Sequence, residues 1–493
     1  MARIRSVDAR GWIAGHALLV VAAAFLLTAC GSLQPQPATT TRPALPAQYD
    51  PPLLAAPAAE PAAALQARWW SQLQDAQLDA LITRAIAANR ELRTAAARIA
   101  EARALAGLVD ARAQPLVSLG GYAARDRQSD NGRFGPLEFN PVNERRVGFD
   151  ASWELDVFGA IARRQEAARA DALAAAAQSG AVAVSVAGEV AAIYVELRAA
   201  QAQQKALREL IEAARGIEQL VAARERAGLA STFDRLRTEQ QVLVTMAELP
   251  LAQAREQNAV RRLGVLVGGD SQTLLTELAP LKPLPAVLPA LPAALPAALL
   301  ERRPDLLAAE SQWQAALARV TAAQADRYPR ISLGAAIGQL SIRQGNFFNG
   351  ASAAWNFAAA LRAPLYAPDL AAAAAVERAR AEQAALSYES AAVNAVLEVE
   401  QAALRLQRAQ EREAQLAAAL ATDLEALALA RIRYERGLTD FLGVLDVVRS
   451  RSQVELQWVE ARAQTFVQFV ALNKALGGGW DAKAVALSAA AKP

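Results

Sequence analysis

The hydrophobic pattern contains one segment, residues 147–157, in which every second residue is apolar. The intervening positions include three acidic side chains, Asp150, Glu154 and Asp156. A period of two is typical of a β-strand with one apolar and one polar face. The run also has the length of roughly 9–11 residues that a strand needs to cross a bilayer. The pattern therefore predicts a membrane strand over about residues 146–158, with its apolar face toward lipid and these three acids lining the lumen of a barrel.

Three further segments have strand character, and polar loops connect the four strands in two pairs. We predict these strands over about residues 115–125, 329–342 and 352–366. Four strands cannot close a barrel, and open sheet edges are not tolerated in lipid, so several chains would have to share one barrel. The same residues also allow a soluble four-stranded sheet packed against helices, but an acidic face suits a wet lumen better than a dry core.

Long alanine-rich tracts with a helical pattern follow each strand pair, over about residues 159–268 and 369–477. A helix of 60-odd residues would reach on the order of 90–100 Å at 1.5 Å per residue, so each tract is expected to turn back on itself. Gly228 and Gly437 mark the expected turns, and a serine or threonine just after Gly228 can cap the returning helix. Such hairpins from several subunits can close into a hollow cylinder or pack as a solid coiled coil.

The two halves of the chain repeat the same order of two strands followed by a helical hairpin. The sequence Ala-Gly-Leu-Ala around Gly228 returns roughly 200 residues later as Arg-Gly-Leu-Thr around Gly437. We assign repeat 1, a connector, repeat 2 and a C-terminal tail to residues 69–282, 283–300, 301–480 and 481–493. The connector is apolar, but its five prolines exclude a transmembrane helix.

The N-terminal segment has the charge and hydropathy pattern of a secretory signal. Arginines precede an apolar run, and the segment ends in Leu-Thr-Ala-Cys, which resembles the bacterial lipobox. We predict a signal peptide over residues 1–29, attachment of diacylglyceryl and N-acyl chains such as palmitate to Cys30, and an extended Pro- and Ala-rich tether over 30–68. No Asp directly follows the cysteine, which favours sorting to the outer membrane. The alternatives are an ordinary signal peptide with a chance cysteine, or a buried free cysteine.

The composition excludes several classes of chemistry. Cys30 is the only cysteine, and His16, in the leader, is the only histidine. The mature chain therefore has no intrachain disulfide, no cysteine cluster for a metal and no histidine-based catalytic triad or zinc site. The net charge is +3, without a basic stripe interleaved with aromatic residues, so nucleic acid is not an expected partner. We expect no enzymatic activity, no catalytic residue, no metal and no cofactor.

Three short motifs resemble outer-membrane efflux proteins of the TolC/OprM type: Trp69-Trp-Ser-Gln-Leu-Gln-Asp75, Arg303-Pro-Asp-Leu306 and Tyr328-Pro329. Together with the lipobox, they resemble the lipoprotein branch of that family. The resemblance implies a mainly α fold with membrane β-strands: a homotrimer whose twelve-stranded β-barrel continues into a long periplasmic α-helical barrel. It also implies a passive exit duct in the outer-membrane lipid. The duct would work with a periplasmic adaptor (membrane fusion) protein and an inner-membrane pump of the resistance-nodulation-division class, and would export drugs or other small toxic compounds.

The resemblance further implies a gate where the helix-hairpin tips of this family pinch the periplasmic end of the duct. Tyr434 and Gly437 match the family's Tyr-x-x-Gly, and Asp446 ends a matching Val-Leu-Asp. Rings of Asp446 from three chains would favour cations in a narrow pore. Hydrogen bonds or ion pairs from Tyr434, Arg433 or Arg436 to acids on the neighbouring hairpin would latch the closed state.

Two further acids complete the gate candidates. The family often has an acid where this chain has Gly443, and Asp440 can substitute for it on the same turn. Asp234 lies at the tip of the first hairpin. The alternative for Asp234 and Asp446 is that they only cap or solvate the returning helices.

Two other functions stay open at this stage. One is an outer-membrane channel for type I protein secretion. The other is a lipid-anchored coiled-coil adaptor or structural protein, which would have no lipid-facing strands.

Overall fold

The computed structural model describes residues 45–46, 68–127, 129, 131, 141–284, 288–289, 300–342, 345–439 and 441–480. The predicted signal peptide, Cys30, most of the tether and of the proline-rich connector, Asp440 and the tail from residue 481 onward lie outside this part of the chain. The chain divides into two compact units, which are considered separately. The strand unit comprises Glu101–Ala172 and Ser311–Leu386, with the undescribed Met1–Thr41; the hairpin unit comprises Arg42–Ala100, Leu173–Glu310 and Ser387–Pro493.

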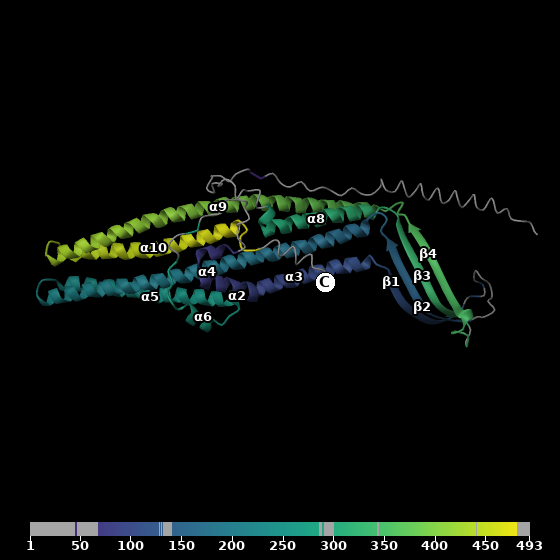
Figure 1. The fold of residues 1–493 in the computed structure, drawn as a ribbon, viewed down its shortest axis with the longest axis horizontal. Helices are drawn as coiled ribbons and strands as arrows, with labels where there is room; N and C mark the ends of the chain where they lie inside the picture. The colour runs from purple at the N-terminus through teal and green to yellow at the C-terminus, as the bar shows by residue number, and fades with distance from the viewer. Residues whose placement is uncertain are drawn as a thin grey trace, which may run out of the picture. The chain divides into compact units, whose positions relative to one another are not determined.

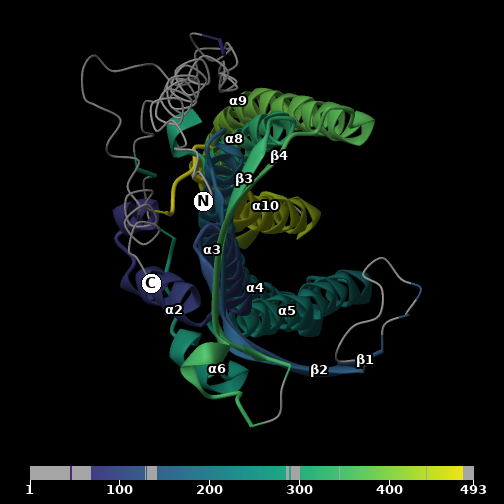
Figure 2. The same cartoon turned by 90° about the vertical axis from the view of Figure 1, so that its right-hand side faces the viewer.

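Four antiparallel strands form one sheet in the strand unit, in the order β1-β2-β3-β4 (Figure 2). They are β1 (Leu116–Asp126), β2 (Val142–Leu155), β3 (Arg330–Ser341) and β4 (Ala353–Arg362). Each half of the chain supplies one hairpin of strands. The pairing of β2 with β3 joins the two hairpins into a single sheet.

The start of β2 and the end of β4 differ from the sequence prediction, because a strand ends where its partner ends. β2 starts at Val142, earlier than the predicted residue 146, since its pairing with β1 continues as far as Asp126. β4 stops at Arg362, short of the predicted end, because Arg362 already pairs with Arg330, the first residue of β3.

The register gives the sheet one apolar and one polar face, because directly paired residues of neighbouring strands point to the same side. The large side chains of the apolar face include Val117, Leu119, Val147, Phe149, Trp153, Leu333, Ile337, Trp355, Phe357 and Leu361. The hydrogen-bonding side chains of the polar face include Ser118, Arg146, Asp150, Ser152, Glu154, Ser332 and Asn356. Trp355 and Phe357 are 72% and 75% exposed in the single chain. A contiguous exposed apolar surface of this kind indicates contact with lipid or with another chain.

A glycine pair brings β2 and β3 unusually close on the polar face. Gly148 and Gly338 lie directly opposite each other. A Cβ added at Gly148 would lie 2.6 Å from the carbonyl oxygen of Ile337 and 2.9 Å from the Cα of Gly338. Only glycine fits this backbone contact without a shift of one of the strands.

Parts of four helices complete the strand unit: α3 (Arg90–Arg112), α4 (Ala160–Arg226), α8 (Pro304–Ala325) and α9 (Pro368–Glu435). Small residues allow α8 and α9 to approach closely, with Ala316, Val320 and Ala381 in one buried cluster. Asp110 pairs with Arg169 at 3.0 Å between α3 and α4. This ion pair is half exposed and contributes at most about 1 kcal/mol, so the apolar contacts determine the packing.

The hairpin unit contains two long antiparallel helical hairpins (Figure 1). α4 leads into α5 (Thr232–Val267), and α9 leads into α10 (Phe441–Ala475). The unit also contains the first turns of α3 and α8 and three short elements, η3 (Trp69–Leu73), α2 (Ala76–Ala88) and α6 (Ser271–Leu278). One window of α4 is long and apolar enough to cross a membrane, but 61% of it is buried within the structure, as expected for a core helix.

The Trp-Trp motif near the start of the described chain belongs to the core of the hairpin unit. Trp69 and Trp70 are both 2% exposed, and their rings meet edge to face with centroids 5.7 Å apart. Phe469 of α10 completes the group, with its ring centroid 6.0 Å from that of Trp69. The motif therefore anchors η3 to the last helix by aromatic packing.

Candidate gate and channel-lining residues

Both helical hairpins turn at a glycine in the left-handed backbone conformation. Gly228 has φ +73° and Gly437 has φ +72°. In each turn the second residue of the Gly-Leu pair donates its N–H to a carbonyl five residues earlier, from Leu229 to Arg224 at 2.8 Å and from Leu438 to Arg433 at 2.9 Å. This is the Schellman motif, which satisfies carbonyls at a helix end and favours glycine at the left-handed position. The two halves of the chain thus close their hairpins in the same way.

Asp234 takes part in a capping box at the start of α5. Its backbone N–H donates to the Oγ of Ser231 at 3.2 Å. Its carboxylate accepts the backbone N–H and the hydroxyl of Ser231 at 3.2 Å and 2.8 Å. The reciprocal bonds satisfy helix-terminal donors. The carboxylate has a structural task at this tip, in agreement with the capping alternative for Asp234.

Arg224 links the two hairpin tips within one chain. Its guanidinium carbon lies 4.5 Å from the centroid of the Tyr434 ring, a cation–π contact. Its Nη1 donates to the backbone carbonyl of Tyr434 at 3.2 Å. The same carbonyl accepts the N–H of Gly437 at 3.0 Å, which closes the second turn. The sequence reasoning missed Arg224, although it precedes Gly228 by the same number of residues as Arg433 precedes Gly437.

Tyr434 lies in an apolar cluster between the hairpins, with 6% of its surface exposed. Its buried neighbours in this cluster are Ile217, Val221, Leu427, Val444, Leu445 and Val448. The Val-Leu pair before Asp446 is therefore part of this core. Tyr434 is positioned to hold the two tips of one chain together.

Two further gate candidates, Arg436 and Asp446, lie at the surface of the second tip. Arg436 and Asp446 are exposed, and neither side chain makes a hydrogen bond or ion pair with another described residue. Asp440 lies outside the described residues. The single chain therefore leaves Arg436 and Asp446 accessible to a neighbouring molecule.

The polar face of the sheet is less acidic than the sequence pattern suggested. Asp150 forms an ion pair with Arg146, four residues earlier on the same strand. Glu154 lies 3.9 Å from Arg330 of β3. Both acids keep the face that the alternation predicted, but each has a cationic partner there. The face is thus charge-balanced where these pairs lie.

Asp156 has a different position from the other two predicted lumen acids. It follows the last residue of β2, and its carboxylate accepts the backbone N–H groups of Ile161 at 3.0 Å and Ala162 at 2.7 Å. These donors belong to the first turn of α4, where an acid also interacts favourably with the helix dipole. The structure therefore gives Asp156 the role of capping α4 and ends β2 before the predicted residue 158.

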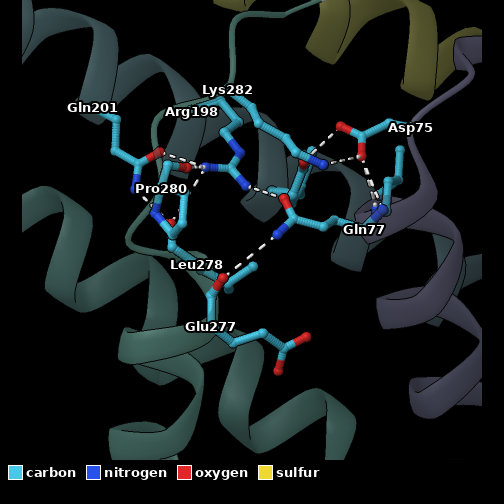
Figure 3. A network of polar contacts seen from close by, with 10 residues as sticks. Asp75, Gln77, Arg198, Gln201, Glu277, Leu278, Pro280 and Lys282 are labelled. Atoms are coloured by element: carbon cyan, nitrogen blue, oxygen red, sulfur yellow. Dashed lines mark hydrogen bonds and ion pairs between the residues drawn. The ribbon is translucent and has the colours of Figure 1, made fainter.

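A buried arginine ties the segment after α6 to α4 (Figure 3). Arg198 is 1% exposed. Its Nη1 donates to the carbonyl oxygens of Leu278 at 3.3 Å and Pro280 at 2.9 Å. The guanidinium also donates to the side-chain oxygens of Gln201 at 2.6 Å and Gln77 at 2.5 Å. These bonds hold the end of α6 and the residues just before the connector.

Tyr194 extends this network to α2. Its ring lies 4.9 Å from the guanidinium carbon of Arg198, and its hydroxyl donates to the carboxylate of Asp75 at 2.5 Å. Burial, followed by this hydrogen bond, raises the pKa of Tyr194 above its ordinary value. Asp75 is also the N-cap of α2, accepting the N–H groups of Gln77 and Leu78.

The described residues contain no group of three or more His, Cys, Asp or Glu side chains that could hold a metal ion.

Comparison with known proteins identifies the class to which this architecture belongs. The model of the outer membrane efflux protein family matches residues 81–269 and 295–478, which include both helical hairpins and all four strands. The chain belongs to the outer membrane efflux protein family. The two matched segments correspond to the two halves of the internal repeat.

The alignments with curated relatives cover most of this chain and most of each relative. The chain is 31% identical over 434 residues to the multidrug resistance outer membrane protein MdtP of Shigella flexneri, covering 85% of this chain and 88% of MdtP. It is 29% identical over 421 residues to the outer membrane protein OprJ of Pseudomonas aeruginosa, covering 84% and 86%. The cation efflux system protein CusC of Escherichia coli is 30% identical over 424 residues, covering 84% and 89%.

Solved structures of channels have the same fold. The outer-membrane channel OprN superposes with a TM-score of 0.83 at 31% identity, covering 90% of this chain and 99% of OprN. CusC superposes with a TM-score of 0.78 at 26% identity, covering 90% and 99%. With the family assignment, these likenesses make the protein an outer-membrane efflux channel with a helical part that extends into the periplasm.

Proposed function

We propose that the protein is a passive trimeric exit duct of a tripartite efflux system. The observation that carries this proposal is a sheet with an exposed apolar face, whose two outer strands each pair with only one other described strand. Unpaired backbone groups at such edges are costly in lipid, so the edges of β1 and β4 need partners. Pairing with further copies of the same chain would satisfy them.

Three copies would close a barrel of conventional size. One chain gives four strands, and three chains give twelve, within the range of known membrane barrels. In that arrangement the apolar face meets lipid and the polar face, with Asp150 and Glu154, lines the lumen. The six helical hairpins of the trimer would continue the duct on the periplasmic side.

The hairpin tips form the gate in this proposal. Arg224 and Tyr434 hold the two tips of one chain in register, while Asp446 and Arg436 are exposed for contacts with neighbouring chains. Three Asp446 side chains around a narrow opening would attract cations and repel anions. Opening then requires neighbouring tips to separate, and a looser tip would shift the population toward the open state.

The cargo is proposed to be drugs or other small toxic compounds. MdtP is named for multidrug resistance and CusC for cation efflux. These names favour small-molecule export over type I protein secretion. A passive duct supplies no energy of its own, so it would depend on an inner-membrane pump and a periplasmic adaptor.

The anchor is proposed to be lipid on Cys30. The charge, apolar run and lipobox-like residues in the leader support it. Two or more acyl chains would hold the N-terminus in the membrane, since a single chain binds only marginally. Mass analysis of the N-terminal peptide from wild type and Cys30→Ser would test this anchor.

The experiment for the proposed function is complementation. The chain is expressed with a matching pump and adaptor in a Gram-negative strain that lacks its own outer-membrane efflux proteins. Restored drug resistance, which disappears when the pump is inactivated, is the expected result. A chain that assembles in the outer membrane but restores no export with any pump–adaptor pair would contradict the proposal.

A further inference from the structure

The apolar face of the sheet ends at two arginines on the loop side. Along β2, the outward positions from Leu155 to Val147 are apolar, and the next outward position is Arg145. Along β1, Arg125 is the last outward residue of the strand. The apolar stretch of nine residues is close to the length that a strand needs to cross a bilayer, roughly 9–11 residues. Arg125 and Arg145 therefore lie where the hydrocarbon region would give way to headgroups.

The register places the two arginines beside each other on that face. Arg125 pairs with Asn143, and Arg145 pairs with Ala123, so the arginines are diagonal neighbours. Diagonal positions of an antiparallel pair have Cα atoms roughly 7–8 Å apart, within reach of one shared anion for side chains as long as arginine. Asn143 adds an amide on the same face.

Neither arginine has an anionic partner among the described residues. Neither the Arg125 nor the Arg145 side chain forms a hydrogen bond or ion pair within the described part of the chain. The acids nearest in sequence, Asp126 and Glu144, alternate to the polar face, where Glu144 accepts a hydrogen bond from Tyr122. Arginines of the polar face differ in this respect, because Arg146 is paired with Asp150. Within the described part of the chain, the two outward arginines thus have no compensating acid at the edge of the apolar surface.

We propose that Arg125 and Arg145 bind the phosphate group of a phosphorylated lipid in the outer leaflet. The proposal rests on the proposed function, in which the apolar face meets lipid. The helices begin and end at the opposite ends of these strands, since α3 precedes β1 and α4 follows β2. With the helical part in the periplasm, the loop side of the sheet faces the cell exterior. Arginine suits such a ligand because its guanidinium binds phosphate oxygens in a bidentate manner.

The test measures lipid retention by native mass spectrometry. Detergent-purified oligomer is incubated with a bis-phosphorylated lipid A and, separately, with the same lipid after phosphatase treatment. The double variant Arg125→Gln/Arg145→Gln is expected to retain roughly tenfold less phosphorylated lipid than wild type. Retention of the dephosphorylated lipid should be equally weak in both proteins.

A matched control removes the same charge elsewhere. Arg93 and Arg98 are exposed on α3, and neither side chain has a hydrogen-bond or ion-pair partner among the described residues. Arg93→Gln/Arg98→Gln should retain phosphorylated lipid as wild type does. Equal retention of phosphorylated lipid by Arg125→Gln/Arg145→Gln, the control and wild type would overturn the lipid site. An equal loss of phosphorylated and dephosphorylated lipid in Arg125→Gln/Arg145→Gln would also overturn it.

A second double variant at Arg125 and Arg145 distinguishes a folding failure from loss of the lipid site. Arg125→Lys/Arg145→Lys keeps both charges and should retain more phosphorylated lipid than the glutamine variant. If the lysine variant assembles correctly but retains no more phosphorylated lipid than the glutamine variant, the site is overturned. Drug resistance in the complementation strain is measured in parallel. Normal export without any phosphate-dependent retention overturns the lipid site and leaves the duct standing, whereas failure of wild type to export contradicts the duct.

Discussion

The backbone carbonyl of Tyr434 accepts two hydrogen bonds, one from Gly437 in its own turn and one from Arg224 of the other hairpin. The cation–π contact of Arg224 with the Tyr434 ring adds a second connection between the same elements. Because these contacts converge on a turn, a change in Arg224 is expected to alter the tip without disturbing the long helices. At the scale of single residues, Arg224 is therefore the sharpest probe of the proposed gate.

Arg224→Met is expected to loosen the connection between the two tips. Loss of a cation–π contact and one hydrogen bond corresponds to about 1–2 kcal/mol, or roughly 5- to 30-fold more of the open state. The measurement is influx of a large antibiotic that wild-type cells exclude.

Arg226→Gln provides the control for that variant. Arg226 is exposed two residues further along α4, and its Nε donates to the carbonyl of Ala222 in its own helix. Influx in this variant should equal that of wild type. Equal influx in the Arg224 and Arg226 variants would show that the Arg224–Tyr434 contact does not hold the gate.

Tyr194 makes the stability of the hairpin unit sensitive to strong base. Its pKa is raised in the folded state by burial and by the hydrogen bond to Asp75. The stabilising effect is thus fully present below the unfolded pKa of about 10 and is lost as pH rises above it. The thermal unfolding temperature of wild type should therefore fall more steeply between about pH 10 and 11 than that of Tyr194→Phe. Parallel pH profiles for the two proteins would refute this assignment.

At the scale of elements, the packing of the sheet depends on two glycine positions. Its strands alternate between a face of large apolar side chains and a face of small and polar ones, and the glycine pair of Gly148 and Gly338 lies on the second face. The close approach of β2 and β3 depends on the absence of both side chains. This pairing joins the two halves of the chain, so it determines whether the sheet forms as a single unit.

Gly338→Ala is expected to destabilise the sheet, because the added Cβ would collide with the backbone of Val147 and Gly148. Forcing the strands apart should cost about 1–3 kcal/mol. Gly334→Ala is the matched control, since a Cβ at Gly334 meets no atom within 4 Å. The temperature at which the oligomer dissociates in heat-modifiability gels should fall only for Gly338→Ala. The same dissociation temperature for both variants would contradict this account of the glycine pair.

The alternation of β2 was predictable because a period of two is a local property of the chain. Its ends were not, because they depend on β1 and on the first turn of α4, which recruits Asp156. The partner of Asp150 could have been found by extending the alternation past residue 147 to Arg146. The contact between Arg224 and Tyr434 joins residues 210 positions apart, and no local pattern indicates it.

At the scale of the whole molecule, the single chain is incomplete as a membrane structure. Its sheet has an apolar face exposed and two outer edges that no described strand covers. Its hairpin tips leave Asp446 and Arg436 accessible. Each of these features is accounted for when further copies of the chain complete the barrel and surround one opening.

The stoichiometry of the assembly tests this account most directly. The protein is extracted from outer membranes in mild detergent, and the mass of the intact complex is measured by native mass spectrometry. The account predicts a complex of three chains that is rich in helix and contains β-structure. A folded monomer inserted in the membrane, or an assembly whose strands do not add to a closed barrel, would contradict it.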